Sequence, residues 1–294
     1  MFADTVWLLL ELILLFFGVA FLIALIQRRL GAERLRQWMG GPPLLAALKG
    51  IAIGFVTPFC TYSAIPMLVG FRQAGVPPAG YVAFITAAPV LDPVLFGALV
   101  LIVGLKAALV YATIAFLGAL TLGLIAQPLG IERFLKPLPQ ADPSPTCGSE
   151  QAPWQGARTE LTAASRSAVG LLRSVALLLV VGVAIGLIIE AAVSPDDVAT
   201  VTGNNGSFAI PVAAALGTPL YFSTSLFVPI ADSLSTAGVG IGAIVALTIS
   251  GAGANVPEFI ILNKLAQKRL IAIFFAYVFA VALTGGLVAE AVLA

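Results

Sequence analysis

The chain has 294 residues, of which 60% are hydrophobic and 10% are charged, and its mean hydropathy is +1.06. A soluble domain carries about 25% charged residues, so the composition excludes an ordinary soluble domain and predicts an all-α protein that crosses a membrane several times. The 15 basic and 14 acidic side chains nearly balance, which gives no reason to expect nucleic acid as a partner. The absence of histidine excludes imidazole metal sites and histidine-based catalytic triads.

The first apolar run, from Val6 to Ile26, is long enough to form a spanning helix. A cleavable signal peptide is not expected, because the run is long and the segment carries Asp4 and Glu11 instead of a basic start. Four arginines follow the run: Arg28, Arg29, Arg34 and Arg36. By the positive-inside rule, this end of the helix is cytoplasmic and the N-terminus lies outside the cell.

A polar segment, residues 127–165, separates two apolar halves, residues 1–126 and 166–294. Its stretch "PLPQADPSPTCGSEQAP" is rich in Pro, Ser and Gly, which is typical of a flexible linker. We expect this linker to be cytoplasmic and the C-terminus to lie outside. Cys147 lies in the linker, where it is either an incidental reduced thiol or a metal-delivery group, and with Cys60 it forms no CxxC motif. No cofactor or metal site is therefore expected.

The two halves resemble each other. Thr57-Pro58 matches Thr218-Pro219 at an offset of 161 residues. After a two-residue insertion the offset becomes 163 and stays there, and it pairs Pro66 with Pro229, Gly75 with Gly238, Asp92 with Asn255, and Lys106 with Arg269. One constant offset over so many positions indicates an internal duplication.

The charges predict that the two repeats have opposite orientations. The loop after the first helix of repeat one is basic, whereas its counterpart "SPDDVATVTGNNG", residues 194–206, has two aspartates and no base. Lys264, Lys268 and Arg269 cluster late in repeat two, where repeat one has only Lys106. An inverted-topology duplication with interrupted helices is typical of a secondary transporter.

Each repeat is expected to begin and end with a full span and to have four shorter apolar pieces between them. The full spans are residues 6–26 and 107–126 in repeat one, and 168–192 and 270–293 in repeat two. The short pieces of repeat one are residues 44–56, 63–71, 79–88 and 94–103. Arg72 favours a re-entrant hairpin first and a broken spanning helix second. Allowing for hairpins, we expect about 8–10 apolar helical segments in all.

Four stretches interrupt the apolar helices: "TPFCTYSAIP" (residues 57–66), "APVLDP" (88–93), "TPLYFSTSLFVP" (218–229) and "SGAGANVPE" (250–258). Broken backbone at membrane depth is tolerated only where it lines a cavity or is buried in protein. The alternative is a set of proline kinks with local Ser/Thr capping. Symmetry would bring the four together as a substrate site, whose candidate residues are Thr57, Cys60, Thr61, Tyr62, Ser63, Thr218, Tyr221, Ser223, Thr224 and Asn255.

Two carboxylates lie at these breaks. Asp92, between apolar residues and next to Pro93, is a candidate for proton coupling or cation binding, because an unpaired charge at this depth is costly. The competing interpretation is an N-cap for the helix that begins at Pro93, and the matching Asn255 can cap but cannot titrate. Glu258, just after Pro257, is the second coupling candidate or else a first-turn glutamate that favours the helix dipole.

Cys60 is a thiol beside a helix break. It is either a small buried hydrophobe or a ligand for a soft solute such as trivalent arsenic or antimony.

The stretch "TPFCTYSAIPMLVGFRQAGVPPAGYVAFITAAPVLDP" resembles the signature of the ArsP/YraQ-type permeases, and "GAGANVPE" is similar to the closing motif of that family. The family pattern contains Pro-x-Cys-Ser/Thr-Cys-Ser-x-x-Pro, followed by a Gly-Val-Pro turn. The resemblance covers nearly the whole chain and implies a multi-span inner-membrane permease without a nucleotide-hydrolysing subunit, in a family that includes efflux permeases for trivalent organoarsenicals. The second cysteine of the pattern is Tyr62 here, so a two-thiol arsenic clamp at this loop is not available.

The leading hypothesis is a secondary permease, and a channel is the alternative in the same class. No G-x-x-x-x-G-K-[ST] loop is present. An intramembrane enzyme would need a base to activate a nucleophile such as Cys60, and no histidine is available. A structural subunit would have no need for duplicated helix breaks. Gly182 and Gly186 form a G-x-x-x-G motif, which allows close helix packing within the chain or in a homodimer. The expected partners are the lipid bilayer and a small-molecule or metalloid substrate.

Overall fold

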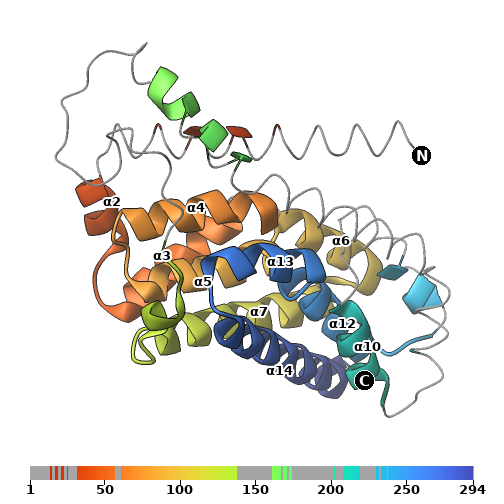
Figure 1. Ribbon diagram of the computed structural model, residues 1–294. Helices are drawn as coiled ribbons and strands as arrows, with labels where there is room; N and C mark the ends of the chain where they lie inside the picture. The colour runs from red at the N-terminus through yellow and green to blue at the C-terminus, as the bar shows by residue number, and fades with distance from the viewer. Residues whose placement is uncertain are drawn as a thin grey trace.

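The computed structural model describes residues 14, 17–18, 21–22, 25, 32–56, 61–137, 161–166, 168–170, 172–173, 202, 208–218, 230–231, 233–236 and 238–293. Within these residues the chain is helical, apart from turns and one isolated antiparallel bridge between Leu135 and Ala266. Most of the expected opening spans, residues 6–26 and 168–192, lie outside the described residues. Figure 1 shows the labelled helices, α2 to α14, gathered in one elongated bundle.

The four short helical pieces expected in the first half are present as separate helices. They are preceded by a short polar helix and followed by a long apolar one. The first-half helices are α2 (Ala32–Met39), α3 (Pro43–Val56), α4 (Thr61–Gln73), α5 (Pro78–Val90), α6 (Pro93–Val103) and α7 (Leu105–Ala126), and a 3-10 turn, η1, covers Ile131–Phe134.

The second half follows the same plan where it is described. Its helices are α10 (Ala209–Gly217), α12 (Ile241–Gly253), α13 (Val256–Leu265) and α14 (Lys268–Leu293). The predicted closing spans, residues 107–126 and 270–293, are confirmed as α7 and α14. Both are long and apolar enough to cross a membrane, as is the stretch Ile241–Ile260. Helices α5 and α6 would together make a fourth span, bent by 42°.

Proline and an N-cap residue produce the two described breaks. Proline lacks an amide hydrogen and disfavours helical geometry in the residue before it. Asp92 therefore leaves the helix with φ −60° and ψ 126°, and α6 begins at Pro93. Asn255 takes φ −104° and ψ 161°, and α13 begins one residue before Pro257.

Equivalent features recur 163 residues apart. Helix α5 and helix α12 differ by this offset at both ends. Both are preceded by the same turn, in which Gly75 has φ +72° and Gly238 has φ +74°. The amide of Gly75 donates to Arg72 O, and the amide of Gly238 donates to Ser235 O, each at 3.1 Å. These positive φ angles require glycine in both halves.

The packing follows the same register. Helix α7 packs on α5 in the first half, and α14 packs on α12 in the second. A Cβ added to Gly123 of α7 would meet Ala79 O, Ala83 Cβ and Ala47 Cβ. A Cβ added to Gly286 of α14 would meet Gly242 O, Ala246 Cβ and Ile210 Cγ2, which are the same three positions shifted by 163. Glycine at both points lets the helix backbones approach closely.

The offset of 163 already holds in α3 and α10. Gly54 faces Phe84 O, Ala87 Cβ and Ala88 N, and Gly217 faces the residues 163 positions later, Leu247 O, Ser250 Oγ and Gly251 N. The predicted offset of 161 ahead of a two-residue insertion is therefore wrong for these helices. In this register Thr218 corresponds to Phe55, and Thr57, Pro58 and Pro219 lie outside the described residues.

Helices α7 and α14 are in contact and run in opposite directions. A Cβ on Gly118 would touch Val281, one on Gly285 would touch Ile114, and the Tyr277 hydroxyl lies within hydrogen-bond reach of Thr121. The partner number falls as the α7 number rises, which is the contact pattern of antiparallel helices. Gly118 and Val281 are themselves 163 residues apart.

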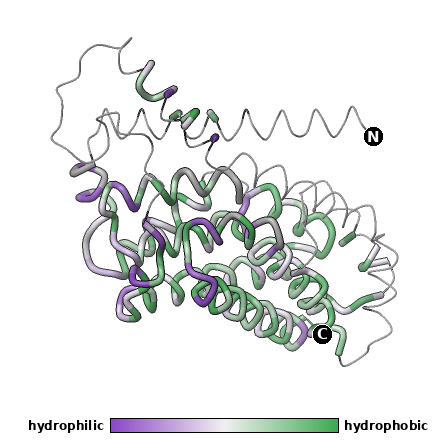
Figure 2. The backbone as a smooth tube through the Cα atoms, in the orientation of Figure 1, coloured by the Kyte–Doolittle hydropathy of each residue, from purple (hydrophilic) through white to green (hydrophobic). Residues whose placement is uncertain are grey.

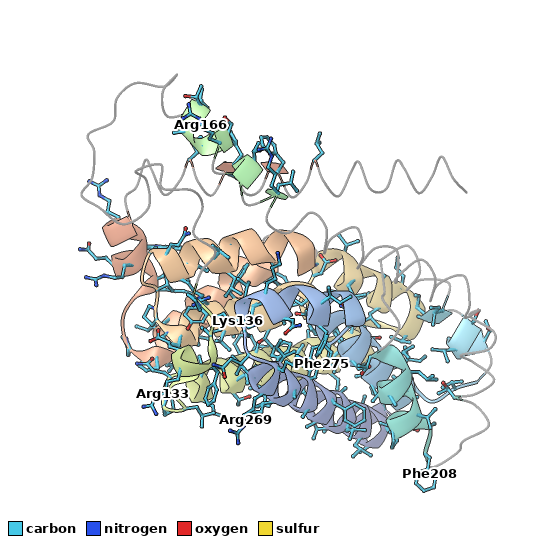
Figure 3. All side chains as sticks on the ribbon, in the orientation of Figure 1. Arg133, Lys136, Arg166, Phe208, Arg269 and Phe275 are labelled. Carbon is cyan, nitrogen blue, oxygen red and sulfur yellow. The ribbon has the colours of Figure 1, made fainter. Side chains whose placement is uncertain are left out.

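Charged side chains gather at one end of the bundle. Arg133, Lys136 and Arg269 lie together there, whereas Phe208 lies at the other end (Figure 3), where Figure 1 marks the C-terminus. Figure 2 shows the hydrophilic segments at the same end and long hydrophobic stretches between the ends. Exposed leucines such as Leu101, Leu109 and Leu117 cover the sides, as expected of surfaces that contact lipid.

Candidate functional site

The two described helix breaks lie side by side. A Cβ on Gly253 would come 2.9 Å from Val90 Cγ2, so the last turns of α5 and α12 are in contact. Val90 and Gly253 are again 163 residues apart, and both stand next to their break. We call residues 91–92 and 254–255, with the first turns of α6 and α13 that follow them, the paired break. The predicted meeting of the breaks is thus observed for two of the four.

Hydrogen bonds to side chains satisfy the first break. Asp92 caps α6, because its two carboxylate oxygens accept from the amides of Val94 at 3.3 Å and Leu95 at 3.4 Å. The carbonyl of Val90, freed where α5 ends, accepts a hydrogen bond from the Tyr111 hydroxyl at 2.5 Å. Tyr111 is fully buried in α7. The contact could not be predicted from the sequence, because it joins residues 21 positions apart.

The second break uses a neutral cap. Asn255 Oδ1 accepts from the Glu258 amide at 2.9 Å, and its amide nitrogen donates to Gly251 O at 3.4 Å. Leu95 and Glu258, the residues whose amides are capped, correspond in the 163-residue register. Phe274 stands where the first half has Tyr111. The two breaks therefore share a backbone design but differ in their side-chain chemistry.

Glu258 has no partner for its carboxylate. The residue is 0% exposed, and neither carboxylate oxygen has a hydrogen-bond partner among the described residues. Other buried polar groups nearby in the sequence do have partners: Thr248 Oγ1 donates to Ile244 O and Ser250 Oγ donates to Leu247 O. Of the described carboxylates, Glu258 alone is both fully buried and unpaired.

The remaining candidate residues are only partly described. Thr57, Cys60, Tyr221, Ser223 and Thr224 lie outside the described residues. Residues 61–63, predicted as Thr61, Tyr62 and Ser63 of the site, form the first turn of α4. Thr218 directly follows α10, and its hydroxyl donates to Ala214 O at 3.3 Å, a local bond within its own helix end. The structure thus places Asp92 at one of the two adjoining breaks and Asn255 and Glu258 at the other, and it leaves the thiol site as a prediction. No group of three acidic or cysteine side chains in the described part of the chain could hold a metal ion.

Sequence reasoning missed a polar cavity at the basic end of the bundle. Its volume is about 420 Å³. Arg72 donates to Lys136 O at 3.1 Å, and burial lowers the pKa of its guanidinium, an effect that Tyr81 and Glu132 oppose. The signal available in the sequence was the pair Arg72 and Tyr81 on either side of the "GVPP" turn. The cavity is lined by Arg72, Gly75, Val76, Pro77, Pro78, Tyr81, Glu132 and Leu135.

The segment after η1 ties the two halves together beside this cavity. The Lys136 amide donates to Leu265 O at 2.9 Å, and the Gln267 amide donates to Phe134 O at 2.8 Å. The Lys136 ammonium also donates to Asn263 O at 2.5 Å. Because Arg72 holds Lys136 from the other side, residues 131–136 connect the end of α4 to the junction of α13 and α14.

Comparisons with known proteins give one relative and one family. A stretch of 103 residues is 35% identical to the UPF0718 protein MJ0584 of Methanocaldococcus jannaschii, and the match covers 35% of this chain and 28% of that protein. The chain therefore spans less than a third of the length of this relative. No solved structure gives a significant match. The profile of the ArsP_1 family, described as a predicted permease, matches residues 2–291, and the chain belongs to this family.

Proposed function

We propose that the protein is a secondary permease of the cell (inner) membrane whose solute passes at the paired break. The observation that carries this proposal is the contact of two helix breaks in the middle of apolar helices. Unpaired backbone groups at this depth are tolerated only where they line a cavity or are buried in protein. Discontinuous helices that meet near the bilayer midplane form the substrate sites of many secondary transporters.

The two halves form an inverted-topology repeat in this proposal. The matched glycine contacts of Gly123 and Gly286 support the repeat, and the opposite directions of α7 and α14 support the inversion. Equivalent helices that run antiparallel are related by a two-fold axis perpendicular to them. Two pairs of residues 163 positions apart are in contact, Val90 with Gly253 and Gly118 with Val281, as such an axis would require where it passes between equivalent residues.

The basic end of the bundle is cytoplasmic in this arrangement. Arg133, Lys136 and Arg269 lie at that end (Figure 3), and the positive-inside rule assigns such an end to the cytoplasm. The linker, residues 127–165, then begins in the cytoplasm and the C-terminus lies outside. The charge pattern of the N-terminal segment places the N-terminus outside as well.

The proposed solute is small, soft and thiophilic, such as a trivalent organoarsenical, and the proposed direction is efflux. Support comes from Cys60 in the "TPFCTYSAIP" stretch, since a thiolate is a soft ligand. The neighbouring hydroxyls would contribute polar contacts: Thr57, Thr61, Tyr62 and Ser63 in the first half, and Thr218, Tyr221, Ser223 and Thr224 in the second. A channel for an unrelated small solute or ion is the alternative. An intramembrane enzyme would need a base beside the thiol, and the chain has no histidine for this role.

The test is uptake of trivalent methylarsenical, phenylarsenical, antimonite and arsenite into everted membrane vesicles. Wild type and Cys60→Ser are compared with Cys147→Ser, which removes the other cysteine. We expect uptake of at least one trivalent organoarsenical by wild type and Cys147→Ser, and loss of uptake in Cys60→Ser. Equal uptake by Cys60→Ser would reject the thiol as a ligand. Absence of flux for every thiophile would reject this substrate class, and flux of an inorganic ion without saturation would favour the channel.

A further inference from the structure

We propose that Glu258 is a proton-binding site and that its proton is the coupling ion of the permease, exchanged for one solute molecule in each cycle. This inference rests on the proposed function and adds the ion that drives it. The structure represents the state in which the Glu258 carboxyl carries the proton.

The Glu258 carboxyl is isolated from other polar groups of the described residues. Glu258 is 0% exposed, and both of its oxygens lack hydrogen-bond partners among the described residues. An ionised carboxylate without a partner is strongly disfavoured away from water, and a carboxyl in such a place takes up a proton instead. The neutral acid is therefore the form that fits this arrangement.

The fold does not need a carboxyl at position 258. The corresponding residue of the first half is Leu95, which is buried at 6% exposure after the same cap and break. Asn255 already caps α13 by accepting the Glu258 amide at 2.9 Å. Since a leucine fills the equivalent position, packing alone does not require an acid at position 258, and we attribute the carboxyl to a chemical role.

The basic residues on the elements around Glu258 lie away from its carboxyl. The other charged residue of α13 is Lys264, six positions away and therefore about 9 Å along the helix. On α14, Lys268 and Arg269 lie at the end that meets the α13 C-terminus, and the segment after η1 carries Lys136, which donates to Asn263 O. These four bases are thus at the far end of α13 from Glu258.

The other charged residues on the elements around Glu258 are two acids, and each has a hydrogen-bond partner. Glu290 of α14 accepts from the amide of Gly242 at the start of α12, and Glu258 follows the other end of that helix. Asp92, in the adjoining break, is held by the amides of Val94 and Leu95. No described base is therefore placed to keep Glu258 ionised, whereas the Asp92 carboxylate is held as a cap by two amides. The proposal assigns one proton, that of Glu258, to each transport cycle.

The proton balance of the cycle is simple. When the site opens to the cytoplasm, the O–H bond of the Glu258 acid breaks and water accepts the proton. The carboxylate that remains is stabilised by water and by the arriving solute. When the site opens to the outside, the solute leaves and the carboxylate takes a proton from the external solution, which restores the neutral acid. No oxidant or other reactant is required.

The experiment uses purified full-length protein in liposomes, with the membrane potential clamped at zero and a gradient of one pH unit. The probe is a trivalent methylarsenical, and Glu258→Gln is compared with wild type. The matched control is Glu290→Gln, which changes a glutamate outside the paired break, at the other end of α12. Exchange of one proton for one neutral solute supports about tenfold accumulation in wild type. We expect the same tenfold ratio in Glu290→Gln, and a ratio of one in Glu258→Gln with downhill flux still present.

Infrared spectroscopy of the same samples gives a readout that does not need a solute. We expect the carbonyl stretching band of a protonated carboxyl at pH 7 in wild type and Glu290→Gln, and its loss in Glu258→Gln and in Glu258→Leu, which copies the residue at position 95. Absence of a band assignable to Glu258, or tenfold accumulation by Glu258→Gln, would overturn the proposal. If wild type moves no solute of the panel, the permease function fails and the coupling role fails with it, while the band still reports whether Glu258 binds a proton.

Discussion

Tyr81 and Tyr111 are both buried, but their hydroxyls are in different situations. The Tyr111 hydroxyl donates to Val90 O, a carbonyl that the end of α5 leaves free. The Tyr81 hydroxyl has no hydrogen-bond partner among the described residues. Leaving a buried acceptor unpaired costs about 1–3 kcal/mol.

Tyr111→Phe should therefore lower the thermal unfolding temperature of the protein in detergent, whereas Tyr81→Phe should leave it unchanged or raise it. The ring of Tyr111→Phe should fit, because Phe274 holds the corresponding place in the second half. Equal effects of the two substitutions would contradict the hydrogen bond at the first break.

Asp92 should behave as a cap. Replacing a capping residue with alanine costs about 1 kcal/mol, and asparagine caps as well as aspartate. Asp92→Asn should keep both stability and flux, because Asn255 does the same work with an amide at the second break. Asp92→Ala should lower the unfolding temperature. Loss of flux in a stable Asp92→Asn protein would show that the charge itself is required.

At the scale of the elements, small residues decide how closely helices approach. Gly50 of α3 faces the backbone of α5, and an added Cβ would collide with Gly80 O. Gly97 of α6 has nothing within 4 Å of an added Cβ. Gly50→Ala should therefore destabilise the protein by about 1–3 kcal/mol or more, and Gly97→Ala should be neutral or stabilising because alanine is the better helix former. Both are measured by thermal unfolding, and a neutral Gly50→Ala would contradict the α3–α5 contact.

The helices themselves could be predicted from the sequence, because proline, glycine and apolar length are local signals. Pro93 and Pro257 predicted the starts of α6 and α13 within one residue, and the long runs predicted α7 and α14. The contacts between elements could not be predicted in this way. The Tyr111–Val90 bond and the connection of Lys136 to Leu265 join residues that are distant in the chain and carry no pattern of their own.

For the molecule as a whole, the correspondence of features 163 residues apart was readable because Gly75 and Gly238, and Asp92 and Asn255, keep one spacing. The offset in α3 and α10 was not, because a two-residue motif such as Thr-Pro can recur by chance, whereas the helix contacts of Gly54 and Gly217 give an offset of 163. At the site, the sequence pointed to Asp92 as the first candidate for proton coupling and to Glu258 as the second. Only burial and hydrogen bonding distinguish the capping carboxylate from the isolated one.

The native thiol at position 147 tests the orientation of the whole molecule. With the linker in the cytoplasm, a membrane-impermeant maleimide should label Cys147 in everted vesicles and not in right-side-out vesicles. A cysteine introduced as Leu293→Cys, near the C-terminus, should show the reverse pattern in a Cys147→Ser background. Labelling of both positions from the same side would contradict the proposed topology.

The most direct test of the central claim is flux of a trivalent organoarsenical into liposomes that contain the purified chain and no ATP. The account predicts saturable flux well above that of protein-free liposomes, because the paired break would supply a solute path without a nucleotide-hydrolysing subunit. Flux no greater than that of protein-free liposomes, for organoarsenicals and for every other thiophile tested with a folded protein, would contradict it.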